Sequence, residues 1–141
     1  MAVREEGRLL IGGDFNTRRG GGGGPIRDVK DAEEGTGRSK DKVVNREGRT
    51  LLNELAEKGW TILNGSNGSE GGWTYIAKTG ESVIDYAVAN TEAEEEIQRV
   101  KEGEREESDH FPIEVKIKEP NLNIEAKQKR EDEVRTLIKN V

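Results

Sequence analysis

Three short stretches of this chain carry the residue types of a hydrolytic site. The single histidine, His110, ends the acidic tripeptide Ser108-Asp109-His110. Near the start, Gly13-Asp14-Phe15-Asn16 follows an apolar run, and Ser82-Val83-Ile84-Asp85-Tyr86 places an acid in an otherwise apolar stretch. A carboxylate held in a sheet can orient an imidazole and stabilise its protonated form. We therefore expect the carboxylate of Asp85 to lie within hydrogen-bonding reach of the His110 ring.

These residue types suit the hydrolysis of a phosphodiester. That reaction needs a base to prepare water, positive charge for the transition state and an acid for the leaving oxygen. Asp14, a metal ion and His110 could fill the three roles, with Asn16 orienting Asp14 or a phosphate oxygen. Hard oxygen ligands and the lack of cysteine favour magnesium or manganese over zinc.

Each motif also has an ordinary structural interpretation. Gly-Asp-x-Asn is a common turn sequence, and Asp85 could pair with a neighbouring basic group. Trp73 and Tyr75 belong more often to a core or a sheet face than to a substrate site. The three motifs occur together and in order, each beside a strand-like run, and this conjunction favours the hydrolytic interpretation.

The predicted strands would bring the motifs together. The run Arg8–Gly13 is typical of a buried strand that delivers Asp14 and Asn16 at its end, and residues 112–118 alternate like a half-exposed strand just after His110. Two β-rich runs, 73–76 and 83–88, indicate a hairpin. We expect Asp14, Asn16, Asp109 and His110 to converge at one end of the sheet in an open, shallow site.

Further elements follow from caps and periodicity. Asn45 can cap a helix that ends at Gly59, with one apolar face formed by Leu51, Leu52, Leu55 and Ala56. The chain from Gly20 to about Val44 is predicted to be a long loop, and 60–64 a strand. Residues 91–107 predict a turn of helix and a short edge strand at 97–100, and the end of the chain predicts a charged helix.

Composition bounds these expectations. The 141 residues are 30% apolar and 37% charged and include 18 glycines, which is little core-forming material for this length and is typical of half a fold. We divide the chain into a partial domain, 1–119, and a tail helix, 120–141. No apolar segment fits a signal peptide or a membrane span, so we expect an intracellular protein, nuclear or cytoplasmic, that does not bind a membrane.

The charge is unevenly distributed along the chain. The net charge is -6, and residues 61–110 hold 4 basic and 12 acidic groups. Basic residues gather instead between Arg18 and Arg49, where acids are interleaved with them. Such a stretch is either a nucleic-acid-binding patch or a solvated loop, and the sequence leaves both open.

From about Leu9 to Ile117, the three motifs resemble the C-terminal half of the endonuclease/exonuclease/phosphatase superfamily. The glycine- and arginine-rich insert, the Gly-Trp-Thr-Tyr segment and Ser-Asp-His-Phe-Pro-Ile most resemble the endonuclease domains of non-LTR retrotransposons. The resemblance implies an α/β fold: the C-terminal half of a four-layer, DNase I-like α/β sandwich, largely one mixed or antiparallel sheet with flanking helices. It implies DNA as the partner and Mg²⁺ or Mn²⁺ as the cofactor.

The resemblance also implies roles for single residues. Asp14 matches the base that activates water, Asn16 its orienting partner, and His110 the imidazole that contacts phosphate. Asp85 matches the acid that pairs with this histidine, and Asp109 a residue near the metal and leaving group. The implied metal ligands are Asp14, Asn16 and Asp109, and the implied substrate-binding residues are Thr74, Ser82 and Arg18.

One departure from the family limits these expectations. Family members bring an early Asn and a metal-binding Glu from an N-terminal half, and this chain begins just before Gly-Asp-Phe-Asn. We expect that half to be a covalent or separate partner, and the chain alone to expose a sheet face and to be weak or inactive. The alternatives are a phosphatase acting on a small phosphorylated ligand and an inactive remnant that binds nucleic acid.

Overall fold

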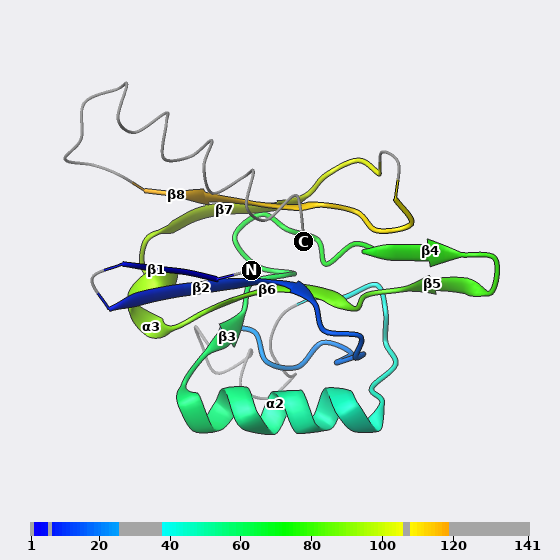
Figure 1. Cartoon of the computed structure of the whole chain (residues 1–141), viewed down its shortest axis with the longest axis horizontal. Helices are drawn as coiled ribbons and strands as arrows, with labels where there is room; N and C mark the ends of the chain where they lie inside the picture. Colours follow the sequence, from blue (N-terminus) through cyan, green and yellow to red (C-terminus); the bar gives the residue numbers. More distant parts are fainter. Residues whose placement is uncertain (1, 6, 26–37, 106–107, 119–141) are drawn as a thin grey trace.

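The structure, a computed structural model, describes residues 2–5, 7–25, 38–105 and 108–118. It is an α/β arrangement rich in strands (Figure 1). The elements are β1 (Ala2–Glu5), β2 (Arg8–Asp14), α2 (Arg46–Lys58), β3 (Thr61–Ile62), β4 (Tyr75–Ala77), β5 (Gly80–Ser82), β6 (Asp85–Ala89), α3 (Thr91–Glu94), β7 (Ile97–Glu102) and β8 (Ile113–Ile117). The predicted tail helix lies outside the described residues, as does 26–37 of the predicted loop.

The strands form three antiparallel sheets. Four of them make a central sheet in the order β1-β2-β6-β3, and β4–β5 and β7–β8 are two-stranded sheets. The mixed α/β class is confirmed, but the expectation of largely one sheet is wrong. Between β5 and β6 the chain changes sheet, because the amide of Val83 donates to the Asp41 side chain and that of Ile84 to Thr74, rather than to a neighbouring strand.

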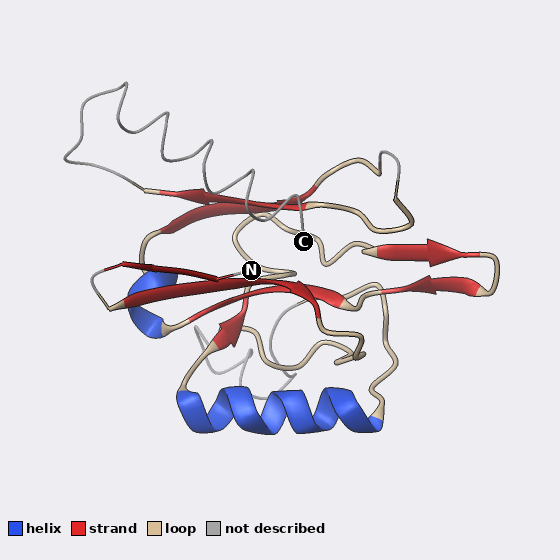
Figure 2. Ribbon diagram, viewed as in Figure 1, coloured by secondary structure: helices blue, strands red, loops and turns tan. Residues whose placement is uncertain are grey.

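Layers cover both faces of the central sheet. In Figure 2, α2 lies under one face and the β7–β8 hairpin over the other. Side chains alternate along β6: Ala87 and Ala89 belong to the cluster under β7–β8, and Tyr86 and Val88 to the cluster over α2. Asp85 lies two residues before Ala87, so its side chain projects from the same face of the sheet as the two alanines. Its carboxylate therefore faces the β7–β8 side, from which His110 approaches.

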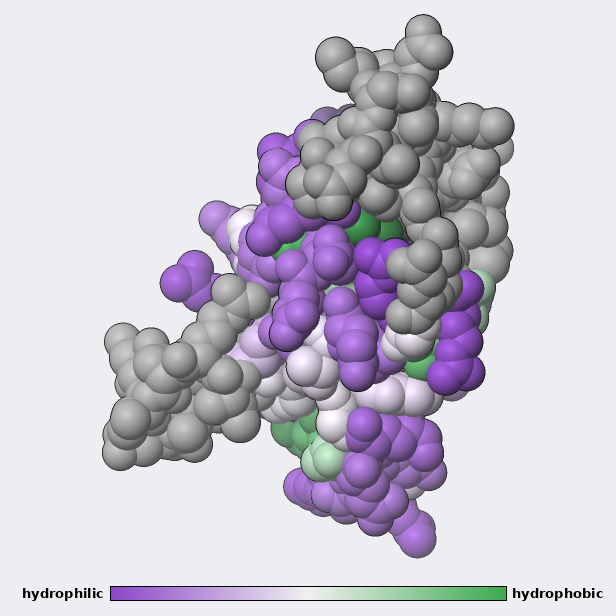
Figure 3. Space-filling view, turned by 90° about the vertical axis from the view of Figure 1, so that its left-hand side faces the viewer, coloured by the Kyte–Doolittle hydropathy of each residue, from purple (hydrophilic) through white to green (hydrophobic). Residues whose placement is uncertain are grey.

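The expected exposed sheet face is not found in the described part of the chain. Among the side chains whose burial is described, Val43 is the one large hydrophobic that is exposed. The face in Figure 3 is mainly hydrophilic, with small separate apolar areas. The reason is that β7 and β8 bury Ile97, Val100 and Val115 against the central sheet. The four-layer sandwich, which needs a second half, stays a prediction.

Helix α2 begins and ends where the caps predict. The Asn45 side chain accepts a hydrogen bond from the Gly48 amide, and Gly59 ends the helix in the left-handed region with φ 70°. Leu55 is buried and Leu51 and Leu52 pack beside it, whereas Ala56 is exposed. The apolar face is thus narrower than expected.

The remaining elements agree with the sequence in type more than in length. The predicted strand at 60–64 shortens to β3, and β1 was not predicted. The short helix α3 and the strands β7 and β8 lie where the sequence places them, with Ile113 and Val115 buried by alternation. The predicted hairpin between 73–76 and 83–88 is wrong in its second strand. The hairpin that forms is β4–β5, and β6 pairs with β2 and β3 in the central sheet. None of the helices described is long and apolar enough to cross a membrane.

Candidate active site

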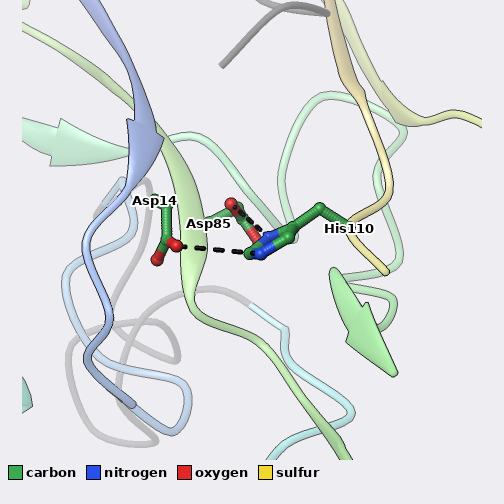
Figure 4. A group of neighbouring side chains, drawn as sticks. All are labelled: Asp14, Asp85 and His110. Carbon is green, nitrogen blue, oxygen red and sulfur yellow. Dashed lines mark hydrogen bonds and ion pairs between the residues drawn. The ribbon is translucent and has the colours of Figure 1, made fainter. Parts of the chain in front are cut away.

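Two carboxylates lie side by side at one end of the central sheet. Asp14 ends β2 and Asp85 begins β6, and the two residues are direct partners in the antiparallel register. Directly opposed residues in such a pair project from the same face of the sheet. The register therefore places both carboxylates on the β7–β8 side. In Figure 4 both of them lie beside the ring of His110.

A third segment carries His110 to the same place. His110 forms an isolated antiparallel bridge with Tyr75 of β4. On either side of it, the Ile76 amide donates to the Asp109 carbonyl at 3.0 Å, and the Phe111 amide donates to the Thr74 carbonyl at 2.8 Å. Backbone bonds to the segment around β4 thus position the histidine, which lies 25 residues from Asp85 along the chain.

The imidazole lies between the two carboxylates. Its Nδ1 is 2.8 Å from Asp85 Oδ2 and 3.0 Å from Oδ1, and its Nε2 is 3.8 Å from Asp14 Oδ2 (Figure 4). The predicted pairing of Asp85 with His110 is confirmed. Since an ionised carboxylate only accepts, Nδ1 carries the hydrogen in the neutral ring, which leaves the Nε2 lone pair facing Asp14.

Burial separates the two carboxylates chemically. The side chain of Asp85 is 6% exposed, against 44% for Asp14. Burial raises the pKa of Asp85 above its usual value, although the hydrogen bonds of His110 and Thr74 act against that rise. The buried acid is thus committed to the ring, and the exposed acid is open to solvent.

Thr74 supports the buried carboxylate from behind. Its side chain is fully buried, and its hydroxyl accepts hydrogen bonds from the amides of Ile84 and Asp85 at 3.0 and 3.1 Å. Thr74 was expected near the substrate. In the structure it lies beneath the site and fixes the start of β6.

Asn16 acts on Asp14 through its backbone. The Asn16 amide donates to Asp14 Oδ1 at 2.8 Å, and Asn16 adopts a positive φ of 51°, which asparagine tolerates better than most residues. The Phe15 amide donates to the Ile84 carbonyl at 2.9 Å, so this turn stays attached to the segment that precedes β6. One Asp14 oxygen is therefore fixed, and the other faces His110.

The sheet end opens into a hollow of about 400 Å³. Its lining residues are Asp14, Asn16, Arg18, Asn45, Tyr75, Ser82, Ile84 and His110. Five of the predicted site residues are among them: Asp14, Asn16, Arg18, Ser82 and His110. Asp85 lies behind His110, and Asp109, exposed beside it, is not part of the lining.

Sequence reasoning missed three residues of the lining: Tyr75, Asn45 and Ile84. The Tyr75 ring packs on the imidazole with 4.9 Å between ring centroids and 56° between planes. Its position next to Thr74 in the Gly-Trp-Thr-Tyr segment was the available signal. Asn45 was recognised only as a helix cap.

The donor set fits a hard divalent cation in part. Ligand atoms of Asp14, Asp85 and His110 lie within 4.8 Å of one another. Asp14 fits as a ligand because its exposed carboxylate opens to the hollow, and Asn16 lies on the same lining. Asp85 does not fit, because both of its oxygens are bonded to Nδ1 of His110.

Comparison with known proteins gives one match. The model of a family described as endonuclease-reverse transcriptase matches residues 1–114, a range that contains all three motifs of the site. Neither the curated proteins nor the solved structures gave a significant match. The match covers most of the 141 residues, and the chain belongs to this endonuclease-reverse transcriptase family, as an endonuclease/exonuclease/phosphatase-type domain like those of retrotransposons.

Proposed function

We propose that this domain is a metal-dependent phosphodiesterase that nicks DNA. The observation that carries the proposal is the imidazole of His110, held by a buried carboxylate on Nδ1 and facing an exposed carboxylate with Nε2. This arrangement lines an open hollow in a chain of the endonuclease-reverse transcriptase family. An open site suits a polymeric substrate better than a closed pocket does.

The side chains divide the reaction between them. Asp14 accepts a proton from the attacking water, whose oxygen forms the new bond to phosphorus. The protonated His110 donates from Nε2 to the leaving oxygen as the old P–O bond breaks. Afterwards Asp14 releases its proton to solvent, and His110 takes up a proton from solvent. Asp85 is a positioning residue, because it fixes the ring and stabilises its charge without reaching the hollow.

A divalent cation supplies positive charge for the phosphate oxygens when it is bound. Mg²⁺ and Mn²⁺ suit the oxygen donors, and Asp14 and Asn16 are the proposed ligands. Asp109, the third ligand expected from the sequence, lies outside the lining of the hollow and is not among the proposed ligands. In the described residues, Asp14 is the one carboxylate of the Asp14–Asp85–His110 group not committed to the imidazole. Because six oxygen ligands are typical for Mg²⁺, we expect weak activity from this chain alone.

Metal binding can be tested on the single histidine. In the proton NMR spectrum, the imidazole C–H signals belong to His110 alone. We expect substoichiometric Mn²⁺ to broaden these signals in the wild type and in the matched control Glu81→Gln, but not in Asp14→Asn. Broadening that persists unchanged in Asp14→Asn would contradict the proposed ligand.

Catalysis can be tested by the nicking of supercoiled plasmid DNA in Mg²⁺. We expect slow nicking by the wild type and by Glu81→Gln, and none by His110→Ala, by Asp14→Asn or in EDTA. Nicking by the wild type that does not exceed that of His110→Ala would overturn the proposal and leave a remnant that at most binds.

A further inference from the structure

One wall of the hollow is not used by the acids and the histidine. It is formed by Arg18, four residues after Asp14, and by Asn45, at the start of α2. Arg18 is the one basic side chain among the lining residues the structure describes. Arg18 thus brings a positive charge close to the carboxylates of Asp14 and Asp85. Its contacts show which residues hold it and which ligand it can bind.

A buried acid holds Arg18. Nε and Nη2 of Arg18 each donate to one oxygen of Asp41 at 2.7 Å. Asp41 is buried, and its carboxylate also accepts the amides of Val43 and Val83, both at 3.1 Å. All four bonds fix the carboxylate, so the guanidinium is fixed as well.

The two hydrogen bonds to Asp41 use one edge of the Arg18 guanidinium and leave its outer edge available. Bonding through Nε and Nη2 commits one edge, and Nη1 has no hydrogen-bond partner among the described residues. The side chain is 33% exposed and lines the hollow. The planar edge that remains has the geometry that recognises phosphate oxygens.

Asn45 adds a second donor with a fixed orientation. Its Oδ1 accepts the amides of Arg18 at 3.1 Å and Gly48 at 2.8 Å. Because both partners are donors, the oxygen end of the carboxamide is assigned, and the opposite end is the NH₂ group. That group has no partner among the described residues, and Asn45 lines the hollow.

We propose that Arg18 and Asn45 form a subsite for a phosphate of the DNA backbone next to the scissile one, with Asp41 as the residue that positions Arg18. This proposal rests on the proposed function, since the neighbouring Asp14 and His110 supply the chemistry. The guanidinium edge and the carboxamide NH₂ are both donors, which selects an oxyanion. Phosphate contacts of this kind set the position of a duplex on a protein without reading its sequence.

The variant Asn45→Asp separates the role of Asn45 as a helix cap from its proposed role in binding phosphate. Asn45→Asp keeps the oxygen that caps α2 and adds a charge favourable at a helix start, so stability should hold or rise. The same change replaces the NH₂ donor with a carboxylate oxygen in the hollow. We expect binding of a fluorescein-labelled DNA duplex, measured by anisotropy in EDTA, to weaken about tenfold, while the exposed control Asn53→Asp on the same helix stays within twofold.

The salt dependence of binding tests Arg18 and Asp41. Each phosphate contact contributes about 0.9 to the slope of log affinity against log salt. We expect Arg18→Gln and Asp41→Asn to lower that slope by about 1, and the control Arg49→Gln to leave it unchanged. A role of the pair in stability alone would lower the unfolding midpoint of Asp41→Asn without changing the slope.

The outcomes separate this inference from the proposed function. Unchanged duplex affinity and salt slope in Arg18→Gln and Asn45→Asp would overturn the subsite even if His110-dependent nicking is found. Weakened binding in both variants would support the subsite even if the wild type does not nick. Inorganic phosphate that competes at micromolar concentration would assign the wall to a small phosphorylated ligand and overturn the DNA subsite.

Discussion

The two walls of the hollow are built in different ways. The acidic wall stands on strands, because the register of β2 and β6 sets Asp14 opposite Asp85. The basic wall, Arg18 and Asn45, stands on loops. Asp41 accepts two hydrogen bonds from the Arg18 guanidinium and is itself held by two backbone amides, and Asn45 accepts the backbone amide of Arg18. A sheet positions its groups by a repeated backbone pattern, whereas the loop wall depends on single residues with no such redundancy.

The adjacent residues Arg18 and Arg19 differ in their burial and in their contacts. Arg18 pairs with an acid and reaches the hollow, but Arg19 is 1% exposed and donates to the carbonyls of Gly22 and Asn64 beside the Tyr86 ring. Burial lowers the pKa of Arg19 to about 10, so it stays charged at neutral pH. In the described part of the chain, neither arginine belongs to a solvated loop.

The largest effect is expected on the acidic wall, from Asp85→Asn. The new amide can donate to Nδ1 and so favours the wrong tautomer of His110. We expect the nicking rate to fall by about 10³-fold or more, with the unfolding midpoint nearly unchanged, since a comparable loss follows such a change in another hydrolase with a His-Asp pair. The loss for Arg18→Gln should be about tenfold, typical of one binding contact.

This ranking has a clear contrary result. Rates for Asp85→Asn within tenfold of the wild type, measured under single-turnover conditions in Mg²⁺, would show that the His110 tautomer does not limit the reaction. The exposed Glu81→Gln serves as the charge-matched control.

Gly48→Ala should have the next largest effect, a loss in the free energy of unfolding caused by a clash at the basic wall. A Cβ at this position would lie 1.9 Å from the Arg18 carbonyl oxygen, and the backbone would have to move. We expect urea denaturation to show a loss of about 3 kcal/mol or more. At Gly59, no atom lies within 4 Å of such a Cβ, so Gly59→Ala should cost only about 1 kcal/mol, for its positive φ. Equal losses would contradict the close packing of α2 on Arg18.

The acidic wall could be predicted from the sequence, and the reason is periodicity. An apolar run that ends in Gly-Asp-Phe-Asn and an acid inside an apolar run both place a carboxylate at a strand end. The ordered spacing to His110 then matched a family. The alternation of side chains along β6, which directs Asp85 toward His110, is likewise a property of the strand.

The basic wall could not be predicted in the same way. Arg18 and Asp41 are 23 residues apart within a segment of mixed charges, where many pairings fit the sequence equally well. The change of sheet at Val83 was missed for the same reason, since it depends on the Asp41 side chain taking a backbone amide. Long-range bonds of single side chains leave no periodic signal.

Low pH should destabilise the basic wall, because it protonates the carboxylate of Asp41. Burial acts to raise the pKa of Asp41, but hydrogen bonds from Arg18, Val83 and Val43 outweigh it and hold that pKa below its usual value. The stabilisation is therefore fully present above the pKa of the unfolded chain, about 4, and is lost as pH falls through the lower folded-state pKa.

Asp41→Asn tests this pH dependence. Because Arg18 is one-third exposed and partly screened, we expect a loss of about 2 kcal/mol at pH 7, less than for a fully buried pair. Urea midpoints measured between pH 7 and 3 should converge for the two proteins as the wild type loses the bond. A constant difference down to pH 3 would show that the Asp41 carboxylate is not the titrating group.

The smallest effect is expected at Thr74, on the acidic wall. Thr74→Val keeps the shape of the side chain but removes the hydroxyl that accepts the amides of Ile84 and Asp85. One buried and one partly buried amide lose this acceptor, and we expect a cost of about 1–2 kcal/mol in urea denaturation. Thr74→Ser keeps the hydroxyl and should lie closer to the wild type. If the serine variant is as unstable as the valine variant, the methyl contact of Thr74, and not its hydroxyl, supports the start of β6. The strand-borne wall would then owe its position to packing and register alone.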